Sequence, residues 1–420
     1  MLDIKVIRDN PEFVKQASVN KNDKADVDAI LELDSQRRSL IAEADELKAE
    51  RNAVSAEIPK RKKAGEPVEE VFARMRAVGQ RIDALDETLR KTEAELEDLQ
   101  LSTPNIPHES VQVGGEEKNK IVRQWGEAPK LDFEPRPHWE IGPALGALDF
   151  EAGAKVSGSG FYFLKGDGAK LQRALISYML DTHGADGFVE ITAPHLVNSA
   201  SMTGTGQLPK MQDDMYQVER DGLWLIPTGE VPVTNMHRDE ILPAESLPIS
   251  YVAYTPCFRR EAGAAGKDTR GMIRVHQFDK VEMVKFVRPE ESYDELEKLV
   301  VQAEKILQGL EIPYRVTQLA TGELSFASAK TYDLDLWAAG CKSWLEISSI
   351  SNFEAFQSRR MNTRFRTADK KLAFPHTLNG SGLALARLIP AILENFQTAA
   401  GKVRIPDALI PYMGGKKIIE

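Results

Sequence analysis

Apolar residues recur at alternating spacings of three and four along two stretches near the start of the chain. The first stretch contains Ile30, Leu33, Leu40, Ala44, Leu47, Val54 and Ile58, and the second contains Val71, Met75, Val78, Ile82, Leu85, Leu89, Leu96 and Leu99. A seam held over about four heptads predicts a coiled coil. Because the segment PKRKKAGEP separates the stretches, with Pro59 and Pro67 at its ends, the pattern predicts two antiparallel helices forming a hairpin arm over about residues 27–100.

A different pattern begins after the aperiodic segment that contains Pro104, Pro107 and the Gly114-Gly115 pair. Short β-branched and aromatic runs such as ISYVAYTPCF, VEMVKFV and WLEISSIS follow, with helical stretches at 169–183, 293–310 and 383–396. Strand patterns that come in adjacent pairs predict an antiparallel sheet flanked by helices. We therefore expect an α+β protein with one domain at 1–107 and a second at 108–420.

Net charge, cysteine content and hydropathy argue against several classes of protein. The formal net charge of −10 argues against a chain that coats nucleic acid through its overall field. Cys257 and Cys341 are the only cysteines, too few for a disulfide framework or a cysteine-built zinc site, so no zinc is expected. No apolar run reaches the about 18 residues of a membrane span. We expect a cytoplasmic protein whose partners include neither a membrane nor DNA.

Basic residues are concentrated between the two predicted arm helices. Lys60, Arg61, Lys62 and Lys63 follow one another, and Glu66 is the first acid after them. One interpretation is a solvated turn whose charges aid solubility. The other is a probe for the phosphates of a polyanion, because local lysine and arginine can contact phosphate whatever the net charge.

A second basic and glycine-rich stretch, FRREAGAAGKDTRGMIRVHQF, lies between two predicted strands. Arg259 and Glu261 would leave the same face of the first strand, and Arg274, His276 and Phe278 would share a face of the next. An arginine held on a strand can clamp a phosphate, and Lys267 and Arg270 on the loop could close over a polyphosphate. The alternative is a salt-bridged surface hairpin. No GxxxxGK[ST] loop or strand-flanked GxGxxG occurs.

Three further patterns carry candidate chemistry. Asn379-Gly380-Ser381-Gly382 reads as a turn into a helix with Arg387 on its second turn, where a ligand could approach closely, or as a plain helix start capped by Ser381. In WLEISSISNF, Glu346, Ser348 and Ile350 would face one way and Ser349 the other on a regular strand, and these oxygens suit magnesium. Thr228 and Glu230 are two apart in IPTGEVP and would share one face as a further candidate pair, or they mark a plain exposed strand edge.

Taken in order, the motifs resemble a known family. GFVEITAPHLV with Pro194, FRRE with the later HQF, and GSGLALAR resemble the three signature motifs of class II aminoacyl-tRNA synthetases. PTGEVP, ASAKTYDLDLW, EISSISNFEAFQSRRM and TLNGSGLA are similar to segments of bacterial-type seryl-tRNA synthetases, and the resemblance runs along the whole chain. It implies a class II antiparallel sheet, activation of L-serine by ATP to seryl-adenylate, and transfer of serine to the 3′ end of serine tRNA. Selenocysteine tRNA is a second candidate substrate.

The resemblance also implies roles for individual residues. Arg259, Glu261 and Arg387 would be catalytic, and the ATP site would comprise Arg259, Arg260, Glu261, Phe278, Glu346, Ile347, Ser348, Ser349 and Arg387. Glu346 and Ser349 would hold Mg²⁺. The serine site would comprise Thr228, Gly229, Glu230, Arg259, Glu282, Asn379 and Ser381. Lys60, Arg61, Lys62 and Lys63 would contact tRNA through the arm, and Pro194 would lie in a homodimer interface.

Five positions depart from the usual family pattern. They are Gly229, Arg260, Ser325, Leu345 and Ala386. The alternatives are a specialised second copy with altered inhibitor tolerance, an amino acid:carrier-protein ligase, and a catalytically inactive scaffold. Carrier-protein ligases lack the long arm, and the retained Arg259, Glu261, Glu346 and Arg387 argue against an inactive scaffold.

Overall fold

The computed structural model describes residues 1–262 and 270–420 and divides into two compact units. The smaller unit comprises Leu2–Val19 and Asp23–Pro104. The larger comprises Met1, Asn20–Asn22 and Asn105–Glu420. Among the described helices, not one combines the length and the apolar character that crossing a bilayer requires.

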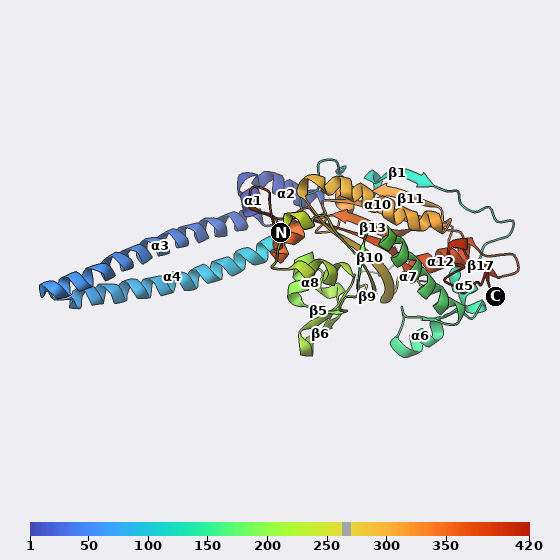
Figure 1. Cartoon of the computed structure of the whole chain (residues 1–420), viewed down its shortest axis with the longest axis horizontal. Helices are drawn as coiled ribbons and strands as arrows, with labels where there is room; N and C mark the ends of the chain where they lie inside the picture. Colours follow the sequence, from blue (N-terminus) through green and yellow to red (C-terminus); the bar gives the residue numbers. More distant parts are fainter. Residues whose placement is uncertain (263–269) are drawn as a thin grey trace. The chain divides into compact units, whose positions relative to one another are not determined.

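Two long helices make up most of the smaller unit. Helices α3 (Val27–Ala64) and α4 (Glu69–Leu101) lie side by side after the short α1 (Ile4–Asp9) and α2 (Pro11–Asn20) (Figure 1). The residues buried along them are Val27, Ile30, Asp34, Ala44, Val71, Ile82, Leu85, Thr92 and Leu96. Ion pairs between the two helices, such as Arg37–Glu93 and Arg81–Glu43, flank this seam. The predicted coiled-coil hairpin is confirmed.

The helix break does not lie where the prolines predicted it. Helix α3 continues through Pro59 to Ala64, and Gly65 ends it with a φ of +69°. A proline removes only one backbone donor, so the flanking hydrogen bonds can carry the helix on, whereas a left-handed glycine stops it. The basic cluster at 60–63 therefore occupies the last turn of α3, and all four residues are exposed.

The root of α3 contains a buried carboxylate. Asp34 is 1% exposed and forms ion pairs with Arg8, which belongs to α1, and with Arg38 one turn further along α3. Both distances are 3.2 Å. Two arginines compensate the cost of burying this charge, and the pair with Arg8 ties the long helix to α1.

An eight-stranded sheet forms the centre of the larger unit. Its order is β1-β11-β12-β13-β16-β10-β9-β4. The strands are β1 (Lys120–Trp125), β4 (Val189–Ile191), β9 (Ile249–Phe258), β10 (Gln277–Val287), β11 (Tyr314–Gln318), β12 (Lys330–Ala338), β13 (Ser343–Asn352) and β16 (His376–Ala384). All neighbours are antiparallel except β4 and β9. The α+β class and the antiparallel sheet are confirmed.

Helices α7 (Asp167–Ala185), α10 (Ser292–Gly309) and α12 (Leu385–Asn395) pack on this sheet. Leu171, Leu299 and Leu388 from the three helices are fully buried in one apolar cluster with Val281 and Leu334 of the strands. The remaining α-helices are α5 (His138–Ala144), α6 (Phe150–Ser157), α8 (Ser199–Thr205), α9 (Glu230–Thr234) and α11 (Phe356–Met361). Smaller sheets join β2 (Leu148–Asp149) with β3 (Phe163–Leu164), β5 (Leu196–Asn198) with β7 (Leu223–Leu225) and β6 (Gln217–Val218), β14 (Arg364–Arg366) with β8 (Ile241–Leu242) and β15 (Leu372–Ala373), and β17 (Val403–Arg404) with β18 (Ile418–Ile419).

The glycine pair of NGSG does not form a turn. Asn379 to Gly382 lie inside β16, a central strand between β13 and β10, and the following helix starts only at Leu385. A Cβ on Gly380 would lie 3.0 Å from Ile350 Cγ1, and one on Gly382 would lie 2.7 Å from His183 Nε2. These glycines therefore permit close packing within a strand, and the prediction of a helix start with Ser381 as cap was wrong.

Two other local predictions were wrong. Thr228 lies in the loop before α9, and Glu230 is the first residue of that helix, so the pair does not sit on a strand edge. Arg274 and His276 precede β10, which begins at Gln277, so they do not share a strand face with Phe278. In both cases the expected strand reached further along the chain than the observed one, into residues that form a loop or a helix.

Candidate active site

A cavity of about 660 Å³ opens over four neighbouring strands of the large sheet, β12, β13, β16 and β10. Its lining includes thirteen of the residues singled out from the sequence: Thr228, Glu230, Arg259, Glu261, Phe278, Glu282, Glu346, Ile347, Ser348, Ser349, Asn379, Ser381 and Arg387. They come from β10, β13 and β16 and from the adjoining loops and helices. The antiparallel sheet thus brings motifs far apart in the sequence to one site.

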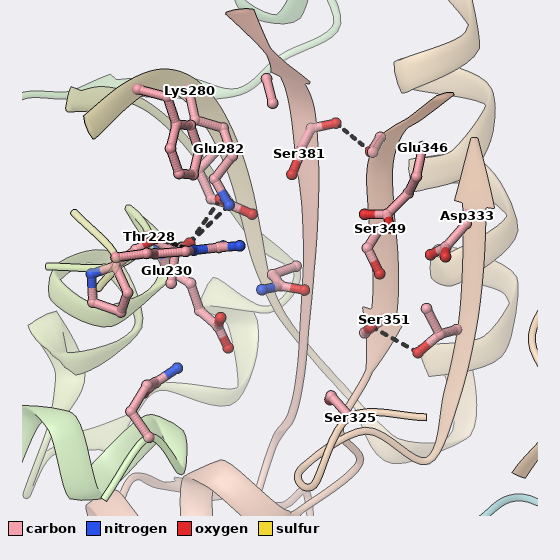
Figure 2. A pocket seen from close by; sticks show the side chains of 18 of the residues that line it. Thr228, Glu230, Lys280, Glu282, Ser325, Asp333, Glu346, Ser349, Ser351 and Ser381 are labelled. Atoms are coloured by element: carbon pink, nitrogen blue, oxygen red, sulfur yellow. Dashed lines mark hydrogen bonds and ion pairs between the residues drawn. The ribbon is translucent and has the colours of Figure 1, made fainter. Parts of the chain in front are cut away.

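One end of the cavity contains a hydroxyl with a complete set of partners. Thr228 Oγ1 donates to Glu282 Oε2 at 2.9 Å, and it accepts from Lys280 Nζ at 2.9 Å and from the Glu230 amide at 3.2 Å. Lys280 Nζ also forms an ion pair with Glu282 Oε2 (Figure 2). Lys280 and Glu282 are nearly fully buried, so this end is a rigid, charged and small polar pocket.

Glu230 faces the same end of the cavity. Gln357 Nε2 donates to its Oε1 at 2.6 Å, while Gln357 Oε1 accepts from Thr377 Oγ1 at 2.7 Å. Burial, with a smaller contribution from the charge of Glu282, raises the pKa of Glu230 to about 7. Two acids and one lysine therefore face a small ligand here, and a cationic group would complete the charge balance.

Arg259 directly follows the last residue of β9 and lines the same cavity. Its guanidinium lies 5.1 Å from the centre of the Phe278 ring, and its Nε donates to Pro227 O at 3.3 Å. The backbone of Arg259 pairs with that of His276 at 2.9 Å, so the arginine extends from an ordered strand end. An aromatic face beside a fixed guanidinium suits a ring and a phosphate bound next to each other.

Glu261 is already paired within the cavity. Its Oε2 accepts from Arg274 Nη1 at 2.6 Å, and both side chains are largely shielded from solvent. The ion pair joins Glu261, three residues after β9, to Arg274, three residues before β10. A ligand that uses the Glu261 carboxylate therefore meets a group already oriented by Arg274.

A bulge in β13 aims the candidate metal ligands. Asp335 pairs with Glu346 and Leu334 with Ser348, which leaves Ile347 as one extra residue. The strict alternation that would separate Glu346 from Ser349 is thereby reset, and both line the cavity. The neighbouring Ser348 also lines the cavity, and its hydroxyl donates to Ser381 O at 2.6 Å.

The carboxylate of Asp333 lies beside Glu346 and Ser349. Figure 2 shows Asp333, Glu346 and Ser349 grouped on β12 and β13. Burial, followed by the charge of Glu346, raises the pKa of Asp333 well above its ordinary value, and Asp333 Oδ1 has no hydrogen-bond partner among the described residues. Arg387 Nη1 lies 3.5 Å from Glu346 Oε1. Two close carboxylates with an unpaired oxygen fit a hard dication.

The structure leaves some predicted residues outside the cavity. Arg260 is exposed and donates to Asp213 O at 3.0 Å, because it follows Arg259 and points to the other side of the chain. Gly229 is buried behind the lining, where a Cβ would lie 3.2 Å from Glu282 Cβ. Arg270 lies over the Trp139 ring at 5.0 Å. Lys267 falls outside the described residues.

The other departures and the predicted interface residue can also be located. Ser325 and Ala386 line the cavity, whereas Leu345 does not. Pro194 is exposed between β4 and β5, and no partner chain is present to test it.

Three residues of the site were not predicted from the sequence. Lys280 precedes Glu282 by two on one strand, and Asp333 alternates with Asp335 in YDLDLW, so the period of two could have indicated both. Gln357 lies on α11, far along the chain from Glu230, and only the fold brings the two together.

Comparisons with known proteins agree with this geometry. Residues 1–107 match the family model described as the seryl-tRNA synthetase N-terminal domain, and residues 216–396 match the tRNA synthetase class II core domain (G, H, P, S and T). The chain is 56% identical to the serine–tRNA ligase of Desulfitobacterium hafniense over 99% of both chains, and 56% identical to that of Geobacillus kaustophilus over the full length of both.

A solved structure extends the comparison to the fold. Seryl-tRNA synthetase from Pyrococcus horikoshii, complexed with ATP, superimposes with a TM-score of 0.93 at 41% identity, covering 100% of this chain and 99% of that one. Family models, full-length relatives and fold agree, and the chain belongs to the seryl-tRNA synthetase family of class II aminoacyl-tRNA synthetases.

Proposed function

We propose that the cavity activates L-serine with ATP and then transfers the serine to the 3′ end of serine tRNA. The observation that carries this proposal is the combination, on one sheet face, of a small acidic pocket, a fixed arginine and a pair of carboxylates suited to a dication. The full-length similarity to serine–tRNA ligases supports the same activity. Selenocysteine tRNA remains a second candidate acceptor.

The acidic pocket suits the amino acid. Glu230 would anchor the serine ammonium, Thr228 would fix the pocket wall through its three hydrogen bonds, and Glu282, Asn379 and Ser381 would surround the hydroxyl. Gly229 would contribute by leaving room for the Glu282 backbone rather than by direct contact. Because buried polar groups would be left unpaired, alanine and glycine should be rejected, while the tight walls should reject threonine.

Arg259 is the main electrostatic group of the first step. Serine's carboxylate oxygen attacks the α-phosphorus of ATP, the bond to pyrophosphate breaks, and a mixed anhydride of the carboxyl and the α-phosphate forms. Negative charge increases on the α-phosphate oxygens in the transition state, and a positioned guanidinium stabilises that charge. The adenine would lie between Phe278 and Arg387, and Glu261 would contact its edge.

Asp333, Glu346 and Ser349 would hold Mg²⁺, with Ile347 and Ser348 forming the wall beside them. A bound dication would neutralise phosphate charge there. The unpaired Asp333 oxygen and the raised pKa of its carboxyl are consistent with a group that awaits a cation. Of these three, Asp333 was not expected from the motifs.

The remaining assignments concern partners. The N-terminal domain at 1–107 would bind tRNA through Lys60, Arg61, Lys62 and Lys63, and the domain at 108–420 would carry catalysis. The exposed Pro194 would lie in a homodimer interface. The cytoplasmic location stays a prediction from the sequence.

One experiment tests the proposed function directly. ATP–pyrophosphate exchange should be measured with serine, threonine, glycine and alanine, followed by charging of serine tRNA. Serine should support exchange at a kcat/KM at least about 10³-fold above the other three, since alanine and glycine lack the hydroxyl that the site is built to bond and the extra methyl of threonine meets the tight walls. Exchange that does not depend on serine would overturn the proposal.

The raised pKa of Glu230 predicts a pH dependence. Below about pH 7 the carboxyl is neutral and the serine ammonium loses its charged partner, so kcat/KM for serine should fall by up to about tenfold per pH unit. Above that pH the carboxylate is present and kcat/KM should level off. The measurement is the exchange rate at subsaturating serine between about pH 5.5 and pH 8.5.

Glu230→Gln provides the control for this pH profile. The amide keeps the size of the side chain but cannot titrate, so the variant should show a low and flat profile over the same range. A wild-type profile that is flat between about pH 6 and pH 8 would contradict the assigned role of Glu230.

A further inference from the structure

A buried polar cluster lies outside the cavity. It joins His138 of α5, Glu394 of α12 and Cys341 of the β12–β13 turn. His138 and Glu394 are both 0% exposed. His138 Nδ1 lies 2.7 Å from Glu394 Oε1, and the Cys341 amide donates to Glu394 Oε2 at 2.9 Å.

The position of the imidazole proton follows from its partners. The Met272 amide, which can only donate, lies 3.1 Å from His138 Nε2, so that nitrogen accepts. Nδ1 therefore carries the proton and donates to Glu394, which also accepts from the His138 amide at 2.9 Å. Burial alone would raise the pKa of Glu394, but the hydrogen bonds from His138 and Cys341 hold it below its ordinary value.

The same geometry speaks against a metal site. A metal would have to displace the Nδ1 proton, and two ligands about 2.1 Å from a tetrahedral ion lie about 3.4 Å apart. The 2.7 Å between His138 Nδ1 and Glu394 Oε1 is a hydrogen-bond distance instead. The cluster is thus a chain of directed hydrogen bonds that ends on the Met272 amide.

Met272 belongs to a segment that continues into the cavity wall. Gly271 has a φ of +73°, and a Cβ there would lie 2.0 Å from His138 Nε2, so the backbone rests directly on the imidazole. Arg270 lies over the ring of Trp139, the neighbour of His138. Ile273, Arg274, Val275 and Phe278, which follow, line the cavity.

Glu394 also connects the other walls. Helix α12 carries Arg387 in the cavity and Glu394 two turns further on. Cys341 lies in the turn between β12 and β13, the strands that carry Asp333 and Glu346. Glu394 lies on α12 and is hydrogen-bonded directly to the β12–β13 turn and, through His138, to the segment that contains Met272. Each of these parts of the chain places a charged residue in the cavity.

We propose that Glu394 and His138 are positioning residues that fix the 270–278 segment against α12 and the β12–β13 turn. They keep Arg274, Phe278 and Arg387 at the spacing that ATP requires. The inference rests on the proposed assignment of the cavity to ATP. It extends the active site to a pair of side chains that do not touch the substrate.

Two variants of His138 separate positioning from simple structural support. His138→Asn can still donate to Glu394 from the place of Nδ1, but it loses the acceptor for the Met272 amide. His138→Gln can accept from that amide at the place of Nε2, but it loses the side-chain donor to Glu394. Because the proposed link needs both hydrogen bonds, positioning predicts that each variant lowers kcat/KM for ATP by about 10- to 100-fold, with KM for serine within about twofold.

The readouts are ATP–pyrophosphate exchange by the full-length chain and its melting temperature. A purely structural role predicts that any loss of activity follows the loss of melting temperature and affects ATP and serine alike. That result, or either variant folded with kcat/KM for ATP within about twofold of the wild type, would overturn the inference. Serine-dependent exchange by the wild type tests the proposed function separately.

Hydrogen exchange decides the question if neither variant folds. In the wild-type protein the Met272 amide should exchange as slowly as the amides of α12, because its acceptor is buried. Exchange at the rate of an exposed loop would overturn the inference.

Discussion

Replacing Arg259 by alanine is expected to lower serine-dependent ATP–pyrophosphate exchange by a factor of about 10³ or more. The guanidinium is the cation held over Phe278 at the end of β9, beside the polar pocket formed by Thr228, Lys280 and Glu282. Its removal takes away the positive charge that we propose to stabilise the transition state, and no other described arginine extends from that strand end into the cavity. The reduction should appear mainly in kcat, because the stabilised charge develops only during the reaction.

The chain offers a matched control at the next position. Arg260 has the same side chain but lies outside the cavity, bonded to Asp213 O. Arg260→Ala should retain exchange within about threefold of the wild type. If both substitutions lowered kcat equally, the clamp would not be specific to Arg259. If Arg259→Ala kept full exchange, the assignment of the phosphate site would fall.

Shortening the hairpin should separate the two steps of the reaction. Deleting 47–80 and joining the ends by a short glycine-rich turn removes the outer part of α3 and α4, including Lys60, Arg61, Lys62 and Lys63, but keeps Asp34 and the paired root. Serine-dependent exchange should stay within about twofold of the wild type, whereas kcat/KM for serine tRNA should fall by about 10³ or more, because phosphate contacts supply much of the affinity.

A substitution at the tip distinguishes charge from length. Changing Lys60, Arg61, Lys62 and Lys63 to glutamine keeps both helices but removes four charges. Charging should fall less than in the truncated chain, and its dependence on salt should weaken, because fewer phosphates are neutralised. Equal loss of exchange and charging in the truncated chain would instead assign the hairpin a structural role.

Much of the fold could be predicted because it follows from local periodicity. The heptad pattern from Ile30 to Ile58 predicted the first helix of the hairpin, and the run ISYVAYTPCF has the same bounds as β9. The errors arose where packing overrides local preference. Pro59 continues a helix supported by its partner, and Gly380 and Gly382 belong to a crowded central strand rather than to a turn.

The candidate site was predictable in composition but less so in geometry. The motifs named thirteen residues that line the cavity, yet strand alternation placed Ser349 opposite Glu346 because the extra residue at Ile347 leaves no mark in the sequence. Gln357 and Glu394 act through contacts that only the assembled sheet and helices create.

The buried carboxylate at the root of α3 has a mechanical consequence. From Asp34 to Ala64 the helix extends by about 45 Å, so each degree of tilt at the root displaces the far end by about 0.8 Å. The ion pairs of Asp34 with Arg8 and Arg38 lie at the root of α3, the end about which the helix would tilt. The stiffness of this root limits how far the basic cluster at 60–63 can move, and under the proposed tRNA contact it would set how much variation in tRNA shape the same residues can accommodate.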